Sequence, residues 1–180
     1  MVTREEIEAG IEKMIQASKV SAKLQMVGLP VPKKPPQLKS NVTLFDEWEQ
    51  LKKTHGGISN IPFDELGNFL DKWTAVISYA RWVEAISDIK QLTSREIRDN
   101  VEKQLYTLQE GSRELRAASV HTEHLYIQWE NQYLEDVAYY LSVKGLRESY
   151  EYRANAISRE ITRRTSEVDN SRRSYNRGGV

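Results

Sequence analysis

Apolar residues recur every three or four positions over most of the chain, which is the spacing of one face of an α-helix. Between Asn68 and Glu110 the sequence contains neither Gly nor Pro, so we expect one helix from about Pro62 to Glu110. A helix of that length cannot bury an apolar stripe against itself, and the stripe therefore predicts a partner helix. The stripe consists of Trp82, Ile86, Ile89, Thr93, Ile97, Val101, Leu105 and Leu108.

The partner helix is expected to begin near Ser112, after a reversal of the chain at Gly111. Its apolar stripe reaches Val168, and Gly145 predicts either a break or a close packing site within it. Beyond the stripe, residues 171–180 are expected to fray into a flexible basic tail. The stripe consists of Leu115, Ala118, Thr122, Leu125, Trp129, Tyr133, Val137, Tyr140, Leu146, Tyr150, Ala154, Ile157, Ile161 and Val168.

Proline and glycine break up the N-terminal part. Thr3 and Glu6 have the spacing of a capping box, which predicts a first helix over residues 3–26. Residues 27–42 carry four prolines and three lysines, which favours a semi-extended linker, with a partner-binding polyproline segment as the alternative. A short helix is expected from Thr43 to His55. We therefore divide the chain into an N-terminal helix (1–26), a Pro/Lys-rich linker (27–42), a helical domain (43–170) and the basic tail (171–180).

These elements predict an all-α fold, a long antiparallel helical hairpin with a smaller N-terminal helical part. Hydrophobic residues make up 39% of the chain and charged residues 29%, which suits long helices with narrow buried faces. Helices of this kind often complete their cores by association, so we expect a homo-oligomer. The candidate interface residues on the stripes are Trp82, Ile86, Ile89, Trp129, Tyr133, Ile157 and Ile161.

The composition excludes several classes of function. The chain has no Cys, so it offers no disulfide, thiolate metal site or cysteine nucleophile, and it fits a reducing compartment. No apolar run is long enough to span a membrane, and the first ten residues have no secretory signal pattern, so we expect a cytoplasmic protein.

Catalytic motifs are missing from the sequence. Neither a P-loop nor a dinucleotide-binding glycine pattern occurs, and nothing singles out a catalytic triad. His121 and His124 lie one helical turn apart, but no further ligand set accompanies them, so we expect no metal site. We predict a protein that is not an enzyme and that needs no cofactor.

The charges balance overall, with 26 Lys plus Arg against 26 Asp plus Glu, but they are segregated. The segment from Ala117 to Leu141 has four acids and neither Lys nor Arg, whereas Ser158 to Arg177 has six arginines and three acids. In a helix, Arg159, Arg163, Arg173 and Arg177 would share one face. Such a face can neutralise phosphates, although an ordinary solvated helix face is the alternative.

Tyr and Trp can stack on unpaired bases, but most of those in this chain lie on the apolar stripes, where packing explains them. Tyr106 beside Lys103, near the expected hairpin turn, is the better candidate for a base contact.

Four short segments of the chain share a pattern of aromatic, basic and apolar residues with a known family: they lie between Leu44 and Lys53, Tyr79 and Lys90, Lys103 and Gly111, and Arg153 and Arg164. They resemble the UvsY family, the recombination mediators of T4-like bacteriophages. They occur in the family's order over residues 44–165, and the extra residues 1–43 have no counterpart. Lys103 is flanked by Glu102 and Gln104, where the family has two basic residues. The resemblance is carried by Leu44 to Lys53, Tyr79-Ala80-Arg81-Trp82 followed by Ser87, Ile89 and Lys90, Lys103-Gln104-Leu105-Tyr106 ahead of Gly111, and Arg153, Ala156, Ile157 and Arg164.

The resemblance implies a ring-like oligomer that acts in DNA recombination and repair, in the host cell cytoplasm if the protein is phage-encoded. It implies binding to single-stranded DNA and help in loading a RecA-like recombinase in place of single-strand-binding protein, without ATP hydrolysis. The candidate DNA-binding residues are Lys90, Arg98, Lys103, Tyr106, Arg153, Arg159, Arg163 and Arg164. The alternative is a helical structural or assembly protein, such as a virion component or scaffold, with no role in DNA binding.

Overall fold

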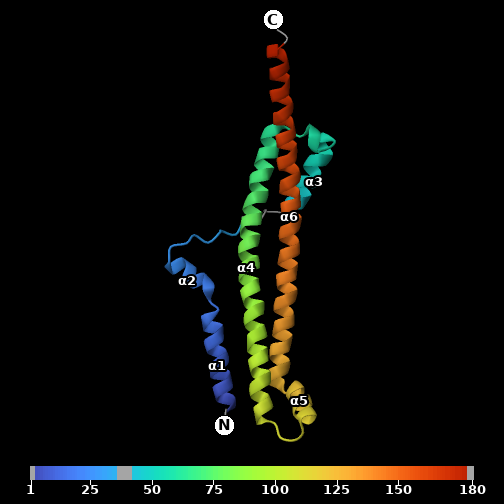
Figure 1. Cartoon of the computed structure of the whole chain (residues 1–180). Coiled ribbons are helices and arrows are strands. Elements are labelled where there is room, and N and C mark those ends of the chain that lie inside the picture. The colour runs from blue at the N-terminus through green and yellow to red at the C-terminus, as the bar shows by residue number, and fades with distance from the viewer. Residues whose placement is uncertain (1–2, 36–41, 178–180) are drawn as a thin grey trace. The chain divides into compact units, whose positions relative to one another are not determined.

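The computed structural model describes residues 3–35 and 42–177, and these form helices and connecting turns without any strand. Helix α4 packs against helix α6 as a helical hairpin with a smaller N-terminal helical part, which confirms the predicted fold class (Figure 1). Over the described residues, no helix combines the length and the apolar character that crossing a membrane requires. The helices are α1 (Arg4–Ala17), α2 (Val20–Met26), α3 (Leu44–His55), α4 (Phe63–Leu108), α5 (Arg113–Thr122) and α6 (His124–Arg177), with a 3₁₀ turn at Ile58–Asn60.

The chain divides into two compact units, and each unit is assembled from two separate segments. Unit 1 comprises Met1–Pro32 and Arg81–Gly145, and unit 2 comprises Lys33–Ala80 and Leu146–Val180. Helices α1, α2 and α5 therefore belong to unit 1 and α3 belongs to unit 2, while α4 and α6 each contribute residues to both.

Two predicted helices are interrupted. The helix expected over 3–26 ends at Ala17, where the Ser18 hydroxyl donates to the carbonyl of Ile15 (2.8 Å), and a new helix begins at Val20. The helix expected from Ser112 breaks at Glu123, whose backbone is extended (φ −69°, ψ 132°). Neither break involves Gly or Pro, which explains why the sequence did not indicate it.

The predicted break at Gly145 is wrong, and within a single chain the structure shows no close packing there. Helix α6 runs through Gly145 without interruption, and a Cβ added there would meet nothing within 4 Å. A glycine costs a helix only about 1 kcal/mol, which a long packed helix can absorb. Helix α6 also continues to Arg177, well into the segment expected to fray. Residues 27–35 of the predicted linker are not helical, and residues 36–41 lie outside the described residues.

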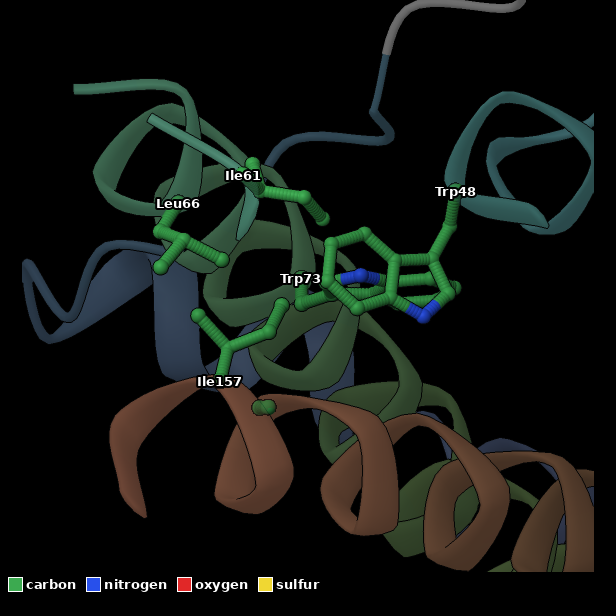
Figure 2. Close-up of a cluster of buried hydrophobic side chains, with 6 residues drawn as sticks. Trp48, Ile61, Leu66, Trp73 and Ile157 are labelled. Carbon is green, nitrogen blue, oxygen red and sulfur yellow. The ribbon is translucent and has the colours of Figure 1, made fainter. Parts of the chain in front are cut away.

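The core of unit 2 is built around two tryptophans. Trp73 is completely buried and Trp48 is 3% exposed. Figure 2 shows side chains from α3, α4 and α6 pointing into this one cluster. Phe45 packs edge-on against Trp73 with ring centroids 5.2 Å apart, and Tyr150 lies 5.8 Å from the same ring. The buried members are Trp48, Ile61, Leu66, Trp73, Ala154 and Ile157.

The core of unit 1 is aliphatic and joins the N-terminal helix to the hairpin. Ile7 of α1 is 2% exposed and packs with residues of α4 and with Val120 of α5. The N-terminal helix is thus part of the packed unit. The buried members are Ile7, Ile97, Val101, Leu105 and Val120.

Matching caps begin a helix in each unit, and one glycine allows the hairpin to turn. Thr3 precedes α1 and Thr43 precedes α3, each in a complete capping box with the acid three residues later. The sequence predicted the box at Thr3, and the structure adds the one at Thr43. Gly111 lies in the turn after α4 with φ 109°, a backbone conformation that favours glycine.

Candidate nucleic-acid interface

A surface hollow of about 570 Å³ lies beside the hairpin turn in unit 1. Because the chain reverses at Gly111, α5 folds back beside the last turns of α4, and both helices line the hollow. The Ser112 hydroxyl accepts from the Leu115 amide and fixes the start of α5. The lining residues are Glu102, Lys103 and Tyr106 from α4 and Arg113, Ala117 and Val120 from α5.

Tyr106 is positioned by contacts on two sides. The Arg116 guanidinium lies 4.5 Å from the centroid of its ring, which is a cation–π contact. The ring also packs against the aliphatic core of unit 1. These two contacts hold the ring in place where it lines the hollow.

The hollow carries more basic than acidic groups. Lys103 and Arg113 are exposed, and Glu102 is the acid in the lining. His121 Nε2 lies 3.6 Å from Glu102 Oε1 at the side of the hollow.

Arg113 and Arg116 were not among the predicted site residues. Their spacing places them one turn apart at the start of the helix that follows Ser112. The spacing of Arg113 and Arg116, together with the expected reversal of the chain at Gly111, would have predicted that both arginines lie near Tyr106.

Three of the predicted DNA-binding cations are exposed and have no side-chain partner among the side chains that the structure describes. Lys90 and Lys103 lie on α4 in unit 1, and Arg159 lies on α6 in unit 2. Lys103 is the one that shares the hollow with Tyr106. These cations are available for contacts with a ligand.

Arg98 is engaged inside unit 1. Its guanidinium donates to Asp99 Oδ1 (2.6 Å) and Glu130 Oε2 (3.3 Å) and lies 4.6 Å from the centroid of the Tyr133 ring. Burial opposes the charged form, but the two carboxylates outweigh it and raise the pKa of Arg98. Its contacts join α4 to α6.

Arg153 is engaged in the aromatic core of unit 2. It donates to the Ser149 hydroxyl (2.8 Å), and its guanidinium lies 4.3 Å from the centroid of the Phe45 ring. A second ring, that of Trp73, lies 6.0 Å away. The Arg153 guanidinium therefore packs on the aromatic rings of the core of unit 2.

Arg163 and Arg164 both bind the buried carboxylate of Glu160. Arg163 donates to Glu160 Oε1 (2.7 Å) and also pairs with Glu167. Arg164 donates to Glu160 Oε1 (2.7 Å) and to the carbonyls of Ile61 (2.6 Å) and Ile58 (2.8 Å). The bonds from Arg163 and Arg164 lower the pKa of Glu160 to about 2. This network attaches α6 to the turn before α4.

The predicted oligomer-interface residues fall into three groups. Ile157 is completely buried within one chain and Ile161 packs on the same core, so the packing of unit 2 already explains Ile157. Trp82 and Tyr133 are half-buried. Ile86, Ile89 and Trp129 line a groove of about 560 Å³ together with Ile15 and Val20 from the N-terminal helices.

In the part of the chain that the structure describes, His121 and His124 do not form a metal site with nearby carboxylates. No group of three His, Asp or Glu side chains there could hold an ion. His121 instead contacts the Tyr126 ring, with centroids 4.6 Å apart.

Comparison with known proteins finds no family model, no curated protein and no solved structure that matches this chain.

Proposed function

We propose that the protein is a non-enzymatic recombination mediator that binds single-stranded DNA through the hollow beside the hairpin turn. The observation that carries the proposal is the grouping of Lys103 and Arg113 around Tyr106 in that hollow. Cations that follow a phosphate backbone, combined with an aromatic ring on which a base can stack, are the common elements of single-strand binding. The resemblance of residues 44–165 to a family of mediators supports the same function.

The hollow is small and the whole chain is neutral, so one copy binds a single strand weakly. Useful affinity requires several copies on one strand, because linked sites bind with a raised effective concentration. A homo-oligomer provides this arrangement. Loading a RecA-like recombinase in place of single-strand-binding protein is the further step that the resemblance implies.

The test is a fluorescence-anisotropy titration of a labelled single-stranded oligonucleotide at low salt. We expect the double variant Lys103→Glu/Arg113→Glu to weaken binding at least tenfold, because two phosphate contacts become repulsive. Tyr106→Leu keeps an apolar side chain against the core and removes the ring, so it should weaken binding by about 1–3 kcal/mol, the range for one base stack.

Lys53→Glu is the matched control, since Lys53 is an exposed lysine on α3 in unit 2. The control should keep wild-type affinity for the oligonucleotide. Absence of any binding at low salt by the wild-type protein would end the proposal. Equal losses in Lys53→Glu and the double variant would show that charge alone, and not this hollow, governs binding.

The second candidate function is a helical assembly protein without a DNA role. The internal pairing of Arg98, Arg153 and Arg164 favours it, because these guanidinium groups already serve the fold. Arg159→Glu separates the two candidates in unit 2, since Arg159 is exposed and has no side-chain partner among the described residues. A mediator whose basic helix face follows the strand loses DNA affinity in this variant, whereas an assembly protein shows no DNA phenotype.

A further inference from the structure

Helix α6 exposes a narrow line of apolar and small side chains within unit 1. Ile127, Leu134 and Leu141 are 45%, 54% and 56% exposed and recur at intervals of seven residues. Ala138 and Gly145 lie between and after them, also exposed, so the line advances in alternating steps of four and three. The opposite face of the same helix, with Trp129 and Tyr133, packs within the unit.

This spacing is that of a coiled-coil seam. One seam position in each seven carries a large apolar residue (Ile127, Leu134 and Leu141), and the other carries Asn131, Ala138 and Gly145. A narrow stripe of this kind suits one partner helix, whereas a face that packs on a globular core is wider. One flank of the seam carries Glu130, Val137 and Lys144. The other flank carries Gln128, Glu135 and Ser142.

We propose that this seam is an interface between two copies of the chain, with α6 of one copy lying antiparallel to α6 of the other. In an antiparallel pair the two sets of seam positions face each other, so a large residue can face a small one. The register centred on residue 136 places Leu134 opposite Ala138 of the second copy. The same register places Ile127 opposite Gly145 of the second copy and Leu141 opposite Asn131 of the second copy.

The small residues fit this arrangement. Gly145 is an exposed helical glycine whose added Cβ would meet nothing within 4 Å, so no contact in the single chain requires it. Opposite the Ile127 side chain of a second copy, a glycine lets the helices approach closely. Because large and small residues face each other in this register, helix α6 of a second copy is the partner that fits the seam.

The flanking charges select the antiparallel orientation. In the register above, Glu130 lies next to Lys144 of the second copy, and this favourable pair occurs twice by symmetry. One like-charge contact, between the two Glu135 side chains, lies at the axis. A parallel pair would instead place Glu130 beside Glu135 of the other copy twice and would leave each Lys144 without an acid.

The seam from Ile127 to Gly145 extends over roughly 27 Å of helix, at 1.5 Å per residue. A contact of this length is small compared with stable obligate interfaces, so we expect a reversible dimer that forms with rising protein concentration. The interface does not depend on the proposed DNA function.

Sedimentation equilibrium tests the contact directly. We expect the wild-type mass to rise with concentration above that of one chain, and Leu134→Glu/Leu141→Glu to shift the apparent dissociation constant upward at least tenfold. Both leucines are half-exposed, so the variant should fold, and circular dichroism checks this. Leu92→Glu on α4, which is 50% exposed, is the matched control and should associate like the wild type. A wild-type mass of one chain at all concentrations, or equal loss in the control, overturns the proposal.

Cysteine cross-linking tests the register, because the chain has no native Cys. A mixture of Ile127→Cys and Gly145→Cys proteins should form a disulfide-linked dimer under mild oxidation, since these positions face each other. Neither variant should cross-link readily alone. Cross-linking of Ile127→Cys with itself would indicate parallel helices and would overturn the antiparallel arrangement.

Discussion

The two units stabilise the same pair of long helices with different side chains. Unit 2 buries two indole rings, with Phe45 and Tyr150 packed against Trp73. The buried cluster of unit 1 is aliphatic, with residues such as Ile97 and Val101, and its aromatic neighbours Tyr106, Tyr126 and Trp129 are only partly buried. Aromatic rings bury more area per residue and add specific ring contacts, so a few residues of unit 2 carry a large share of its stability.

The units also differ in what their cations do. In unit 2, Arg153 stacks on Phe45, and Arg164 donates to two backbone carbonyls before α4. In unit 1, Lys103 and Arg113 are exposed beside Tyr106. A high arginine count therefore says little about nucleic-acid binding until the internal partners of each guanidinium are known.

Trp73→Ala is expected to have the largest effect, because it empties the centre of the unit 2 core. Truncating a buried tryptophan costs about 3–5 kcal/mol in the free energy of unfolding. Trp73→Phe should cost much less, since it keeps a ring and removes the buried Nε1 donor, which has no partner among the described residues. Urea unfolding followed by circular dichroism measures both. A loss below about 1 kcal/mol for Trp73→Ala would contradict the role given to the aromatic core.

Glu160→Gln is expected to have the next largest effect. Loss of hydrogen bonds to two guanidinium groups should cost about 1.5–3 kcal/mol at neutral pH. The pKa of Glu160 is lowered from 4.5 to about 2, so its contribution is complete above pH 4.5 and is lost as pH falls through about 2. The variant should lack that part of the acid sensitivity. Urea midpoints measured across this pH range in dilute protein provide the check.

Glu130→Gln is the matched change in unit 1, where Glu130 is 34% exposed and lies 3.3 Å from Arg98. We expect a loss below about 1 kcal/mol, because solvent screens this ion pair. Equal losses in the two variants would remove the distinction between buried and surface arginine pairs.

The N-terminal caps should show the smallest effects and the least difference between the units. Thr3→Ala and Thr43→Ala each remove a side-chain acceptor for the amide three residues later, at a cost of about 1 kcal/mol. Thr→Ser at either position should retain most of the stability. Thermal unfolding measures these changes, and a cap variant with no effect would indicate that its helix end does not unfold with the rest of its unit.

Local signals in the sequence predicted the ends of short helices well. The short helix expected from Thr43 to His55 matches α3, whose ends are set by the Thr43–Asp46 capping box and by Gly56, because capping depends on neighbouring residues alone. The breaks at Ser18 and Glu123 were missed, since residues of moderate helix propensity continue or end a helix according to their tertiary contacts.

The candidate site was harder to predict for a related reason. Arg153 and Arg164 became candidates through the resemblance, yet each has a partner in the fold that lies far away in the sequence. Arg164 donates to a carbonyl 106 residues earlier, a contact that no periodicity can indicate. The sequence could place Lys103 and Tyr106 together because they are close neighbours on one helix, next to the turn at Gly111.

The assembly of unit 2 from two distant segments sets the order of events during synthesis. Trp48 and Trp73 emerge early, but their core closes only against Ala154 and Ile157. Until the ribosome has passed Ile157, the side of this core that α6 supplies is missing, and a chain segment of about a hundred residues must then close, which makes this step slow. The nascent chain therefore exposes apolar aromatic side chains of this core until α6 has been synthesised, and it should rely on chaperones during that interval.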